Sequence, residues 1–373
     1  MEKIKGFFSN LFSNQIVKKA FMILFIFLFI VVFIIIIASC SNKKAYSYEE
    51  LEKKMVTITK ETYENKKDKL PKNDKDMVTV SLENIIKEGK LKNNIKGDAK
   101  CTGEVKIINN NGYYLYIPYL KCEDKYESKT LYNTLTNDKN ITVSGNGLYQ
   151  VKDEYIYKGD TVNNYLKLNG TVYRILRIND DKTIRLIDTS RQDSVTWDDR
   201  YNVDKQSYVG INSYIYNSVN SRIKDTIERT YENLKDNLKP YLVTTKLCTG
   251  RRSINDNIFD RSIECSESLI SYPIGLMTVS EFYVATIDKN CNAIDSPSCL
   301  NYNYLSDFIS TWTLTPDKDT SYKVYKINTS GAFLSNASTN STYRIVITLN
   351  PDLVVESGDG SETNPYVIKQ FVK

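Results

Sequence analysis

The sequence has 373 residues, of which 41% are hydrophobic and 25% charged, as in an ordinary folded protein rather than a disordered chain. The 50 basic and 45 acidic residues give a net charge of +5, too weak and too evenly spread for a nucleic-acid-binding face. The chain contains no histidine, which excludes Ser-His-Asp and Cys-His catalysis and histidine-ligated zinc.

An apolar segment near the N-terminus predicts a membrane anchor. Residues 21–38 carry no charge, and about 18 such residues nearly cross a bilayer as a helix. Four lysines precede the segment and favour an N-terminus that stays in the cytoplasm. Apolar residues from Ile4 to Phe12 recur at helical spacing, which indicates an amphipathic helix on the inner membrane surface. Residues 1–42 are therefore predicted to be a cytoplasmic amphipathic segment and a single-pass anchor, with the rest extracellular.

Two kinds of anchor fit this segment. Ile37-Ala38-Ser39-Cys40 resembles the bacterial lipobox, which would be cleaved before Cys40 and would leave that cysteine lipidated. The apolar segment is longer than the roughly 7–15 residues of a secretory signal, so we favour an uncleaved helix. A pilin-type leader resembles the layout, but the glycine before the apolar run and the glutamate near its start are missing.

The six cysteines beyond the anchor fall into pairs of near neighbours. An even number suits disulfides in an oxidising compartment, although six cysteines allow 15 connectivities. No C-x2-C pair occurs, so we expect no metal site. The favoured pairs are Cys101 with Cys122, Cys248 with Cys265, and Cys291 with Cys299.

Residues 45–130 predict a helix-plus-hairpin module. Ser47 and Glu50 form a capping box, which predicts a helix from there to about Lys67. The apolar spacing in Thr79–Glu88 predicts a second, shorter helix.

A β-hairpin is predicted around Asn111-Gly112, the preferred pair for a two-residue type I′ turn. The flanking strands would include Val105–Ile108 and Tyr113–Leu120. With this turn, the residue numbers of paired residues sum to 223, so Cys101 lies opposite Cys122. The two form a non-hydrogen-bonded pair, the type with the shorter Cα–Cα distance. The register therefore favours a disulfide between them.

Residues 131–160 predict a linker that merges into strands, and residues 140–373 predict a mixed α+β extracellular domain. Asn179–Lys182 is a hairpin turn between two apolar runs. Apolar residues from Val219 to Leu238 predict an amphipathic helix that ends before Pro240, and Thr278 with Glu281 predicts another capping box. Further strands are predicted at Tyr322–Ile327, Tyr343–Leu349 and Tyr366–Ile368.

A series of short segments in residues 155–370 resembles an uncharacterised extracellular domain of Firmicutes-type surface proteins. The segments, in order, are Tyr173–Ile175, Thr183–Ile187, Ile274–Met277, Trp312–Pro316, Tyr343–Val346, Gly358–Gly360 and Asn364–Tyr366. The C-terminal half is in turn similar to the C-type-lectin-like fold of formylglycine-generating enzymes. The chain departs from the domain at Thr311-Trp312, where a Trp pair is usual, and at Arg344-Ile345, where Arg-Pro is usual. The enzymes' reactive cysteine pair is not carried over, because Cys291 and Cys299 fit a structural staple better.

No residue is predicted to be catalytic, and no cofactor or metal is expected. Weak ligand-binding candidates are Trp197, Asp198 and Asp199, where acids lie beside an aromatic ring as in a sugar or Ca²⁺ site. Arg251 and Arg252, between two cysteines, could bind an anion. The acids of the last turn, Asp359 and Glu362, lack the EF-hand spacing. Each of these sets also fits an ordinary loop or core role.

The sequence thus predicts a membrane-anchored α+β surface protein of non-enzymatic type that binds a glycan or a protein. A carboxylate-based hydrolase such as a glycosidase is the first alternative, and it would need two acids facing each other across a cleft. A structural component of a surface assembly is the second.

Overall fold

The structure, a computed structural model, describes residue 19 and residues 22–30, 45–91, 100–266, 269–306 and 310–371. Residues 22–30 are helical, and no helix within these described ranges is long and apolar enough to cross a membrane. The predicted anchor at residues 21–38 lies partly outside the described residues, and Cys40 lies wholly outside them. Both stay predictions.

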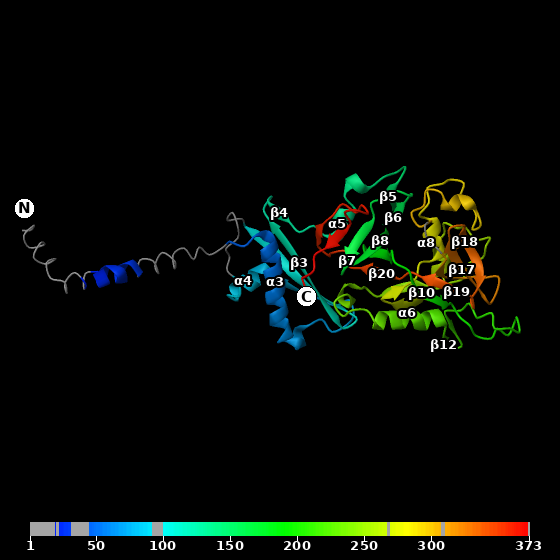
Figure 1. Ribbon diagram of the computed structural model, residues 1–373, viewed down its shortest axis with the longest axis horizontal. Coiled ribbons are helices and arrows are strands. Elements are labelled where there is room, and N and C mark those ends of the chain that lie inside the picture. Colours follow the sequence, from blue (N-terminus) through cyan, green and yellow to red (C-terminus); the bar gives the residue numbers. More distant parts are fainter. Residues whose placement is uncertain are drawn as a thin grey trace, which may run out of the picture.

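The fold is α+β, and strands far outnumber helices among the described residues. Figure 1 shows an elongated molecule, with α3 and α4 at one end and β12, β17 and β18 toward the other. We call residues 45–127 the helix-hairpin part and residues 128–371 the large part. The helix-hairpin part consists of α3 (Tyr48–Glu64), η1 (Lys67–Lys69), β1 (Met77–Ser81), α4 (Leu82–Lys87), β2 (Cys101–Asn110), β3 (Tyr113–Cys122) and β4 (Tyr126–Glu127).

Helix α3 begins where the capping box predicts. The Ser47 hydroxyl accepts from the Glu50 backbone N–H, and the Glu50 carboxylate accepts from the Ser47 N–H, an arrangement that stabilises a helix by about 1 kcal/mol. The helix ends at Glu64, three residues before the expected end. Leu51 and Met55 are buried against the hairpin, whose side chains complete a hydrophobic cluster with them.

The hairpin has the predicted register. Asn111 and Gly112 have φ of 54° and 84°, as a type I′ turn requires, and Asn110 pairs with Tyr113. Nine pairs further, Cys101 lies opposite Cys122 with a Cα–Cα distance of 4.0 Å, and the two form a disulfide. The other two disulfides, Cys248–Cys265 and Cys291–Cys299, are also the pairs that the sequence favours.

The predicted helix Thr79–Glu88 is half wrong. Met77–Ser81 is instead strand β1, which pairs antiparallel with β2 at the edge of a four-stranded sheet, order β1-β2-β3-β4. The valines of this stretch favour a strand once a partner strand lies beside them. Ser81 then caps α4, because its hydroxyl accepts from the Asn84 backbone N–H.

The large part contains short helices and sheets of nine, five and two strands. Its elements are α5 (Leu131–Leu135), η3 (Asp138–Asn140), β5 (Gly147–Val151), β6 (Glu154–Lys158), β7 (Tyr165–Leu168), β8 (Thr171–Ile178), β9 (Ile184–Asp188), β10 (Gln192–Thr196), β11 (Ile215–Tyr216), β12 (Val219–Asn220), α6 (Arg222–Glu232), η4 (Lys239–Tyr241), β13 (Thr245–Cys248), α7 (Ser262–Cys265), β14 (Leu269–Tyr272), β15 (Ile274–Gly275), α8 (Val279–Tyr283), η5 (Pro297–Leu300), β16 (Thr311–Pro316), β17 (Lys323–Asn328), β18 (Gly331–Asn336), β19 (Asn340–Tyr343), β20 (Val346–Leu349), β21 (Val355–Ser357) and β22 (Tyr366–Ile368).

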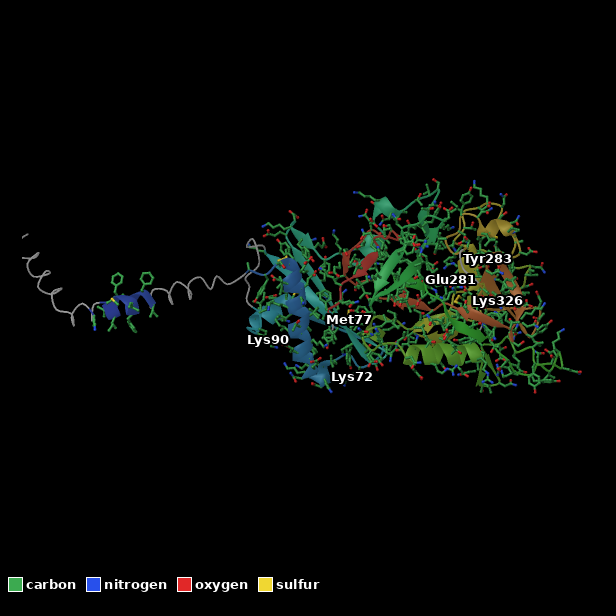
Figure 2. The ribbon with its side chains drawn as sticks, viewed as in Figure 1. Lys72, Met77, Lys90, Glu281, Tyr283 and Lys326 are labelled. Atoms are coloured by element: carbon green, nitrogen blue, oxygen red, sulfur yellow. A yellow bond between two sulfur atoms is a disulfide. The ribbon has the colours of Figure 1, made fainter. Side chains whose placement is uncertain are left out.

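A nine-stranded sheet and a five-stranded sheet form the body of the large part. The first runs β15-β20-β9-β8-β7-β22-β21, with β6 and β5 attached to β8, and the second runs β10-β19-β16-β17-β18. The predicted hairpin on either side of Asn179–Lys182 is β8–β9, and the predicted capping box opens α8. Glu281 of that box lies inside the large part, as Figure 2 shows.

Two expectations for the large part are wrong in part. Residues 131–160 do merge into strands, because β5 and β6 form a hairpin, but their first part is not a linker, since Leu131 and Leu135 of α5 are fully buried in the main core. The helix expected over Val219–Leu238 is shorter: Val219 belongs to strand β12, Ser221 caps α6, and the helix ends at Glu232. In both places tertiary contacts override the local pattern.

The β2–β3 hairpin joins the two parts. Ile107 and Tyr116 face the cluster under α3, whereas Ile108, Leu115 and Ile117 belong to the main core, because neighbouring strand residues point to opposite faces. Ion pairs Lys106–Asp352 (2.6 Å) and Lys369–Glu52 (2.7 Å) cross the same junction.

Candidate functional site

The structure places two of the predicted site residues in the core. Trp197 is fully buried, and its indole N–H donates to the Thr313 carbonyl at 3.3 Å. Asp198 is also fully buried and forms an ion pair with Arg200 at 2.8 Å. Asp199 is exposed but pairs with Arg222 at 2.8 Å. Trp197 and Asp198 are therefore packing residues in this structure, and Asp199 is the exposed member of the candidate set.

Asp198 instead closes the base of a surface loop, residues 199–210. Its Oδ1 accepts from the backbone N–H groups of Arg200 (3.0 Å), near the start of that loop, and Ile211 (3.1 Å), just beyond its end. Gly210 has φ +87°, and a Cβ there would lie 2.3 Å from the Asp198 carbonyl oxygen, so only glycine fits this close approach.

The interior of the loop is also fixed. The Asn202 side chain is buried, and its Nδ2 donates to the Gly210 carbonyl at 2.9 Å while its Oδ1 accepts from the Lys205 N–H at 3.1 Å. The Lys205 ammonium lies over the Tyr322 ring, 5.0 Å from its centroid. These contacts hold the loop in one conformation without using its apolar side chains.

The apolar side chains of the loop point to solvent. Tyr201 and Tyr208 pack edge to face with ring centroids 5.3 Å apart, and Tyr208 and Val203 are 73% and 76% exposed. The neighbouring β11–β12 hairpin adds further exposed apolar residues, and the Arg200 side chain links it to the loop through the Val219 carbonyl. We call this set the tip surface: Tyr201, Val203, Tyr208, Ile215, Tyr216 and Val219. It lies toward the end of the molecule opposite α3 and α4 (Figure 1).

Arg251 and Arg252, the two candidate anion-binding residues, both bond to groups of the chain itself. Arg252 is fully buried, pairs with Glu264 at 2.7 Å, and donates to the carbonyls of Asn257 and Asp260. Arg251 donates to the Ser213 hydroxyl at 2.8 Å. Arg252 is thus a structural residue that holds the Cys248–Cys265 loop from within, which is the core role that the sequence also allowed.

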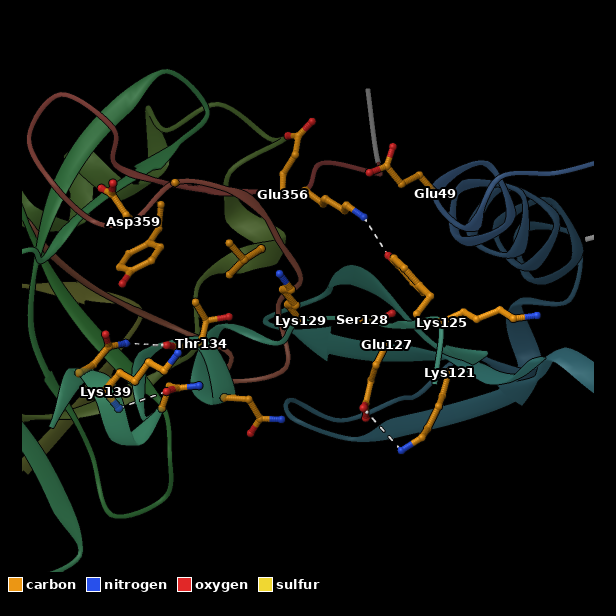
Figure 3. Close-up of a pocket in the computed structure, with 18 of the residues that line it drawn as sticks. Glu49, Lys121, Lys125, Glu127, Ser128, Lys129, Thr134, Lys139, Glu356 and Asp359 are labelled. Carbon is orange, nitrogen blue, oxygen red and sulfur yellow. Dashed lines mark hydrogen bonds and ion pairs between the residues drawn. The ribbon is translucent and has the colours of Figure 1, made fainter. Parts of the chain in front are cut away.

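A second candidate site is a groove of about 1110 Å³ between the helix-hairpin part and the large part (Figure 3). One wall comes from Lys121–Ser128, the other from Val355–Asp359, and α5 and η3 complete it. Most of its lining residues carry polar side chains, with carboxylates, lysines and the side-chain amides of Asn133, Asn137 and Asn140. Asp359 lies here, so one of the two acids of the last turn does reach a cavity.

A hydrogen-bonded polar cluster around Glu52 holds three of the residues that line this groove, Tyr126, Ser128 and Lys369. The buried Glu52 carboxylate accepts from Tyr126 at 2.8 Å, from Ser128 at 2.5 Å and from Lys369 at 2.7 Å. Burial, together with the neighbouring Glu52 carboxylate, raises the pKa of the Tyr126 hydroxyl, so it stays a protonated donor at neutral pH.

Neighbouring hydrogen-bond donors and lysines stabilise the ionised form of three acids in the groove. A bond from the Tyr119 hydroxyl, together with Lys121, lowers the pKa of Glu127, and the Ser361 backbone N–H lowers that of Asp359. The Lys100 backbone N–H and Lys125 lower the pKa of Glu123. A glycosidase needs a carboxylic acid that stays protonated near neutral pH, whereas these three are ionised there. These three acids are suited to hydrogen bonding and ion pairing rather than to proton donation.

Sequence patterns could have indicated the tip surface but not the groove. In residues 201–208, Tyr201, Val203 and Tyr208 stand apart among polar residues with no sustained helical or strand period, which is typical of an exposed loop. The groove is lined by segments around residues 49, 121–140 and 355–369, which only the fold brings together.

Within the described residues, no group of three or more Cys, Asp or Glu side chains is placed to hold a metal ion. No family model, no curated protein and no solved structure matches the chain, so the resemblance of residues 155–370 to an extracellular surface domain stays a prediction.

Proposed function

We propose that this chain is a membrane-anchored surface protein whose outer part binds a protein ligand through the tip surface, without catalysing a reaction. The anchor at residues 21–38, the division into outer segments 45–130 and 140–373, and the lectin-like fold of the second segment belong to this proposal. The observation that carries it is a rigid loop that exposes Tyr201, Val203 and Tyr208.

The free energy of association favours a protein ligand at the tip surface. Large apolar side chains exposed together are typical of interaction sites, and tyrosine is enriched at the centre of protein interfaces. Asp198, Asn202 and Gly210 already fix the loop backbone, so a ligand would pay little ordering entropy on binding. Aliphatic residues such as Val203 and Ile215 favour a protein surface over a sugar, whose hydroxyls would be left without partners there.

The tip-surface proposal is tested with a matched pair of valine variants. Val203→Asp places a carboxylate in the tip surface, while Val143→Asp changes a valine that is 93% exposed and lies outside it. The full chain, in lipid nanodiscs, would be applied to an array of purified secreted and cell-surface proteins and to an oligosaccharide array. We expect a protein ligand whose affinity falls about ten-fold or more with V203D, because a charge is desolvated in the interface, and is unchanged with V143D.

Two outcomes would contradict the proposal. One is a protein ligand that binds V203D as tightly as the unmodified chain. The other is binding to oligosaccharides alone, equal for both variants, which would support a glycan-binding protein that uses another surface. Turnover of an oligosaccharide would favour the hydrolase alternative, and self-association of the chain would favour the surface-assembly alternative.

A further inference from the structure

The groove marks a place where two sheets meet edge to edge. Strand β4 is the last strand of the four-stranded sheet, and β21 is the last strand of the nine-stranded sheet. Just beyond β4 the chain pairs with the β21 segment: Thr130 bridges Val354 antiparallel, the Leu131 N–H donates to the Leu353 carbonyl at 2.7 Å, and the Val355 N–H donates to the Lys129 carbonyl at 2.8 Å.

This seam opens into a fork. Along this seam the residue numbers of facing residues sum to 484, as those of Thr130 and Val354 do. A continued antiparallel ladder would therefore place Glu127 opposite Ser357. Instead the two strands separate after Lys129 and Val355, and Glu127, Ser128 and Glu356 become walls of the groove (Figure 3). The groove therefore begins where hydrogen bonding between the two sheets stops.

The backbone of Glu127 faces this opening. The Ser128 N–H donates to the Leu120 carbonyl at 2.9 Å, and the Leu120 N–H donates to the Ser128 hydroxyl at 2.8 Å, so both backbone groups of Leu120 face the strand that carries Ser128. Because pair types alternate along an antiparallel ladder, Lys121 and Glu127 form a non-hydrogen-bonded pair. The backbone N–H and C=O of Glu127 therefore point away from β3, toward the open edge of the sheet.

We propose that an extended peptide segment of another protein binds in this groove by adding to the edge of β4. The Glu127 backbone N–H would donate to a peptide carbonyl, and the Glu127 carbonyl would accept from the same peptide residue, as in strand addition. The Glu52 cluster beneath Tyr126 and Ser128 holds this edge in place before the peptide arrives. Exposed charges of both signs, Lys129 and Glu356, flank the opening and suit a peptide with polar side chains.

The test separates the backbone of Glu127 from its side chain. Glu127→Pro and Glu127→Ala both remove the carboxylate and its contacts with Tyr119 and Lys121, but only proline also removes the N–H. Because Lys121 and Glu127 form a non-hydrogen-bonded pair, the Glu127 N–H makes no bond to β3. Proline at this position is therefore compatible with the pairing of β3 and β4. Dodecapeptides would be selected from a random display library on the full chain in nanodiscs, and their affinities measured for both variants.

We expect selected peptides to bind E127P at least about ten-fold more weakly than E127A, because a backbone hydrogen bond to the peptide is lost. N-methylation of one of two alternate sets of peptide amides should have the same effect on the unmodified chain, which keeps the test valid if E127P folds poorly. Peptides should bind V203D normally, since the tip surface is separate.

Equal binding of the peptides to E127P and E127A, or tolerance of N-methylation at every amide, would overturn strand addition. So would a library that yields no groove-dependent peptide while oligosaccharides bind in the groove. Neither result bears on the tip surface, whose test uses a different variant.

Discussion

Buried ion pairs hold together both distant and neighbouring segments of this chain. Arg185 meets Glu281 at 2.5 Å across 96 residues, and Arg252 meets Glu264 inside the Cys248–Cys265 loop. Burial alone would raise the pKa of Glu281, but Arg185 and Arg177 outweigh it and lower that pKa to about 2. Glu281 is thus ionised at neutral pH and contributes stability that is present above its unfolded pKa and lost as the pH falls toward 2.

Two adjacent arginines provide a test at this scale. Arg252→Ala would leave Glu264 buried without its partner, so we expect the free energy of unfolding to fall by about 3–5 kcal/mol. Arg251→Ala removes a single bond to the Ser213 hydroxyl and should cost about 1 kcal/mol. Urea unfolding of both variants in detergent micelles measures the difference. Equal small losses would mean that Arg252 is not the structural residue described here.

The residue scale also shows where sequence patterns fail. Trp197, Asp198 and Arg252 have the residue types of a ligand site, yet each is fully buried and hydrogen-bonded within the protein. Residue type predicts which bonds a side chain can make but not whether its partner is a ligand or the chain itself. That choice depends on burial, which only the folded structure reveals.

At the scale of elements, local chemistry was a reliable guide where it fixes backbone conformation. The Asn111-Gly112 turn and the Ser47 and Thr278 capping boxes are where the sequence predicts them, because these residues bond to their own backbone or need φ > 0. Apolar spacing was less reliable. Met77–Ser81 forms a strand because it pairs with β2, and the local spacing of apolar residues gives no sign of that partner.

The β2–β3 hairpin offers a second test. The turn, rather than the disulfide, should set the register, since all ten pairs follow from Asn111-Gly112. Replacing Cys101 and Cys122 by serine should lower the free energy of unfolding by about 3 kcal/mol, the entropy of releasing a loop of this length. Amide exchange protection at Ile108 and Leu115, a hydrogen-bonded pair in this register, should persist. Loss of that protection in the folded variant would show that the disulfide sets the pairing.

At the scale of the whole molecule, the arrangement of the parts lies beyond sequence patterns. The α+β class could be predicted, but not that the hairpin serves two cores, nor that two sheets meet at Thr130 and Val354 and separate into a groove. These features join residues more than 200 positions apart. The tip surface lies away from α3, the first helix after the predicted anchor, which suits a surface that faces outward from a membrane (Figure 1).

Both binding proposals require that the chain beyond about residue 42 folds outside the cytoplasm. Peptide mass spectrometry without reduction, on the full chain from its native membrane, tests this most directly, and it also shows whether the chain begins at Met1 or at a lipidated Cys40. We predict peptides joined through Cys101–Cys122, Cys248–Cys265 and Cys291–Cys299, since disulfides persist only in an oxidising compartment. Free thiols at these six positions would contradict the extracellular location and, with it, both proposed ligands.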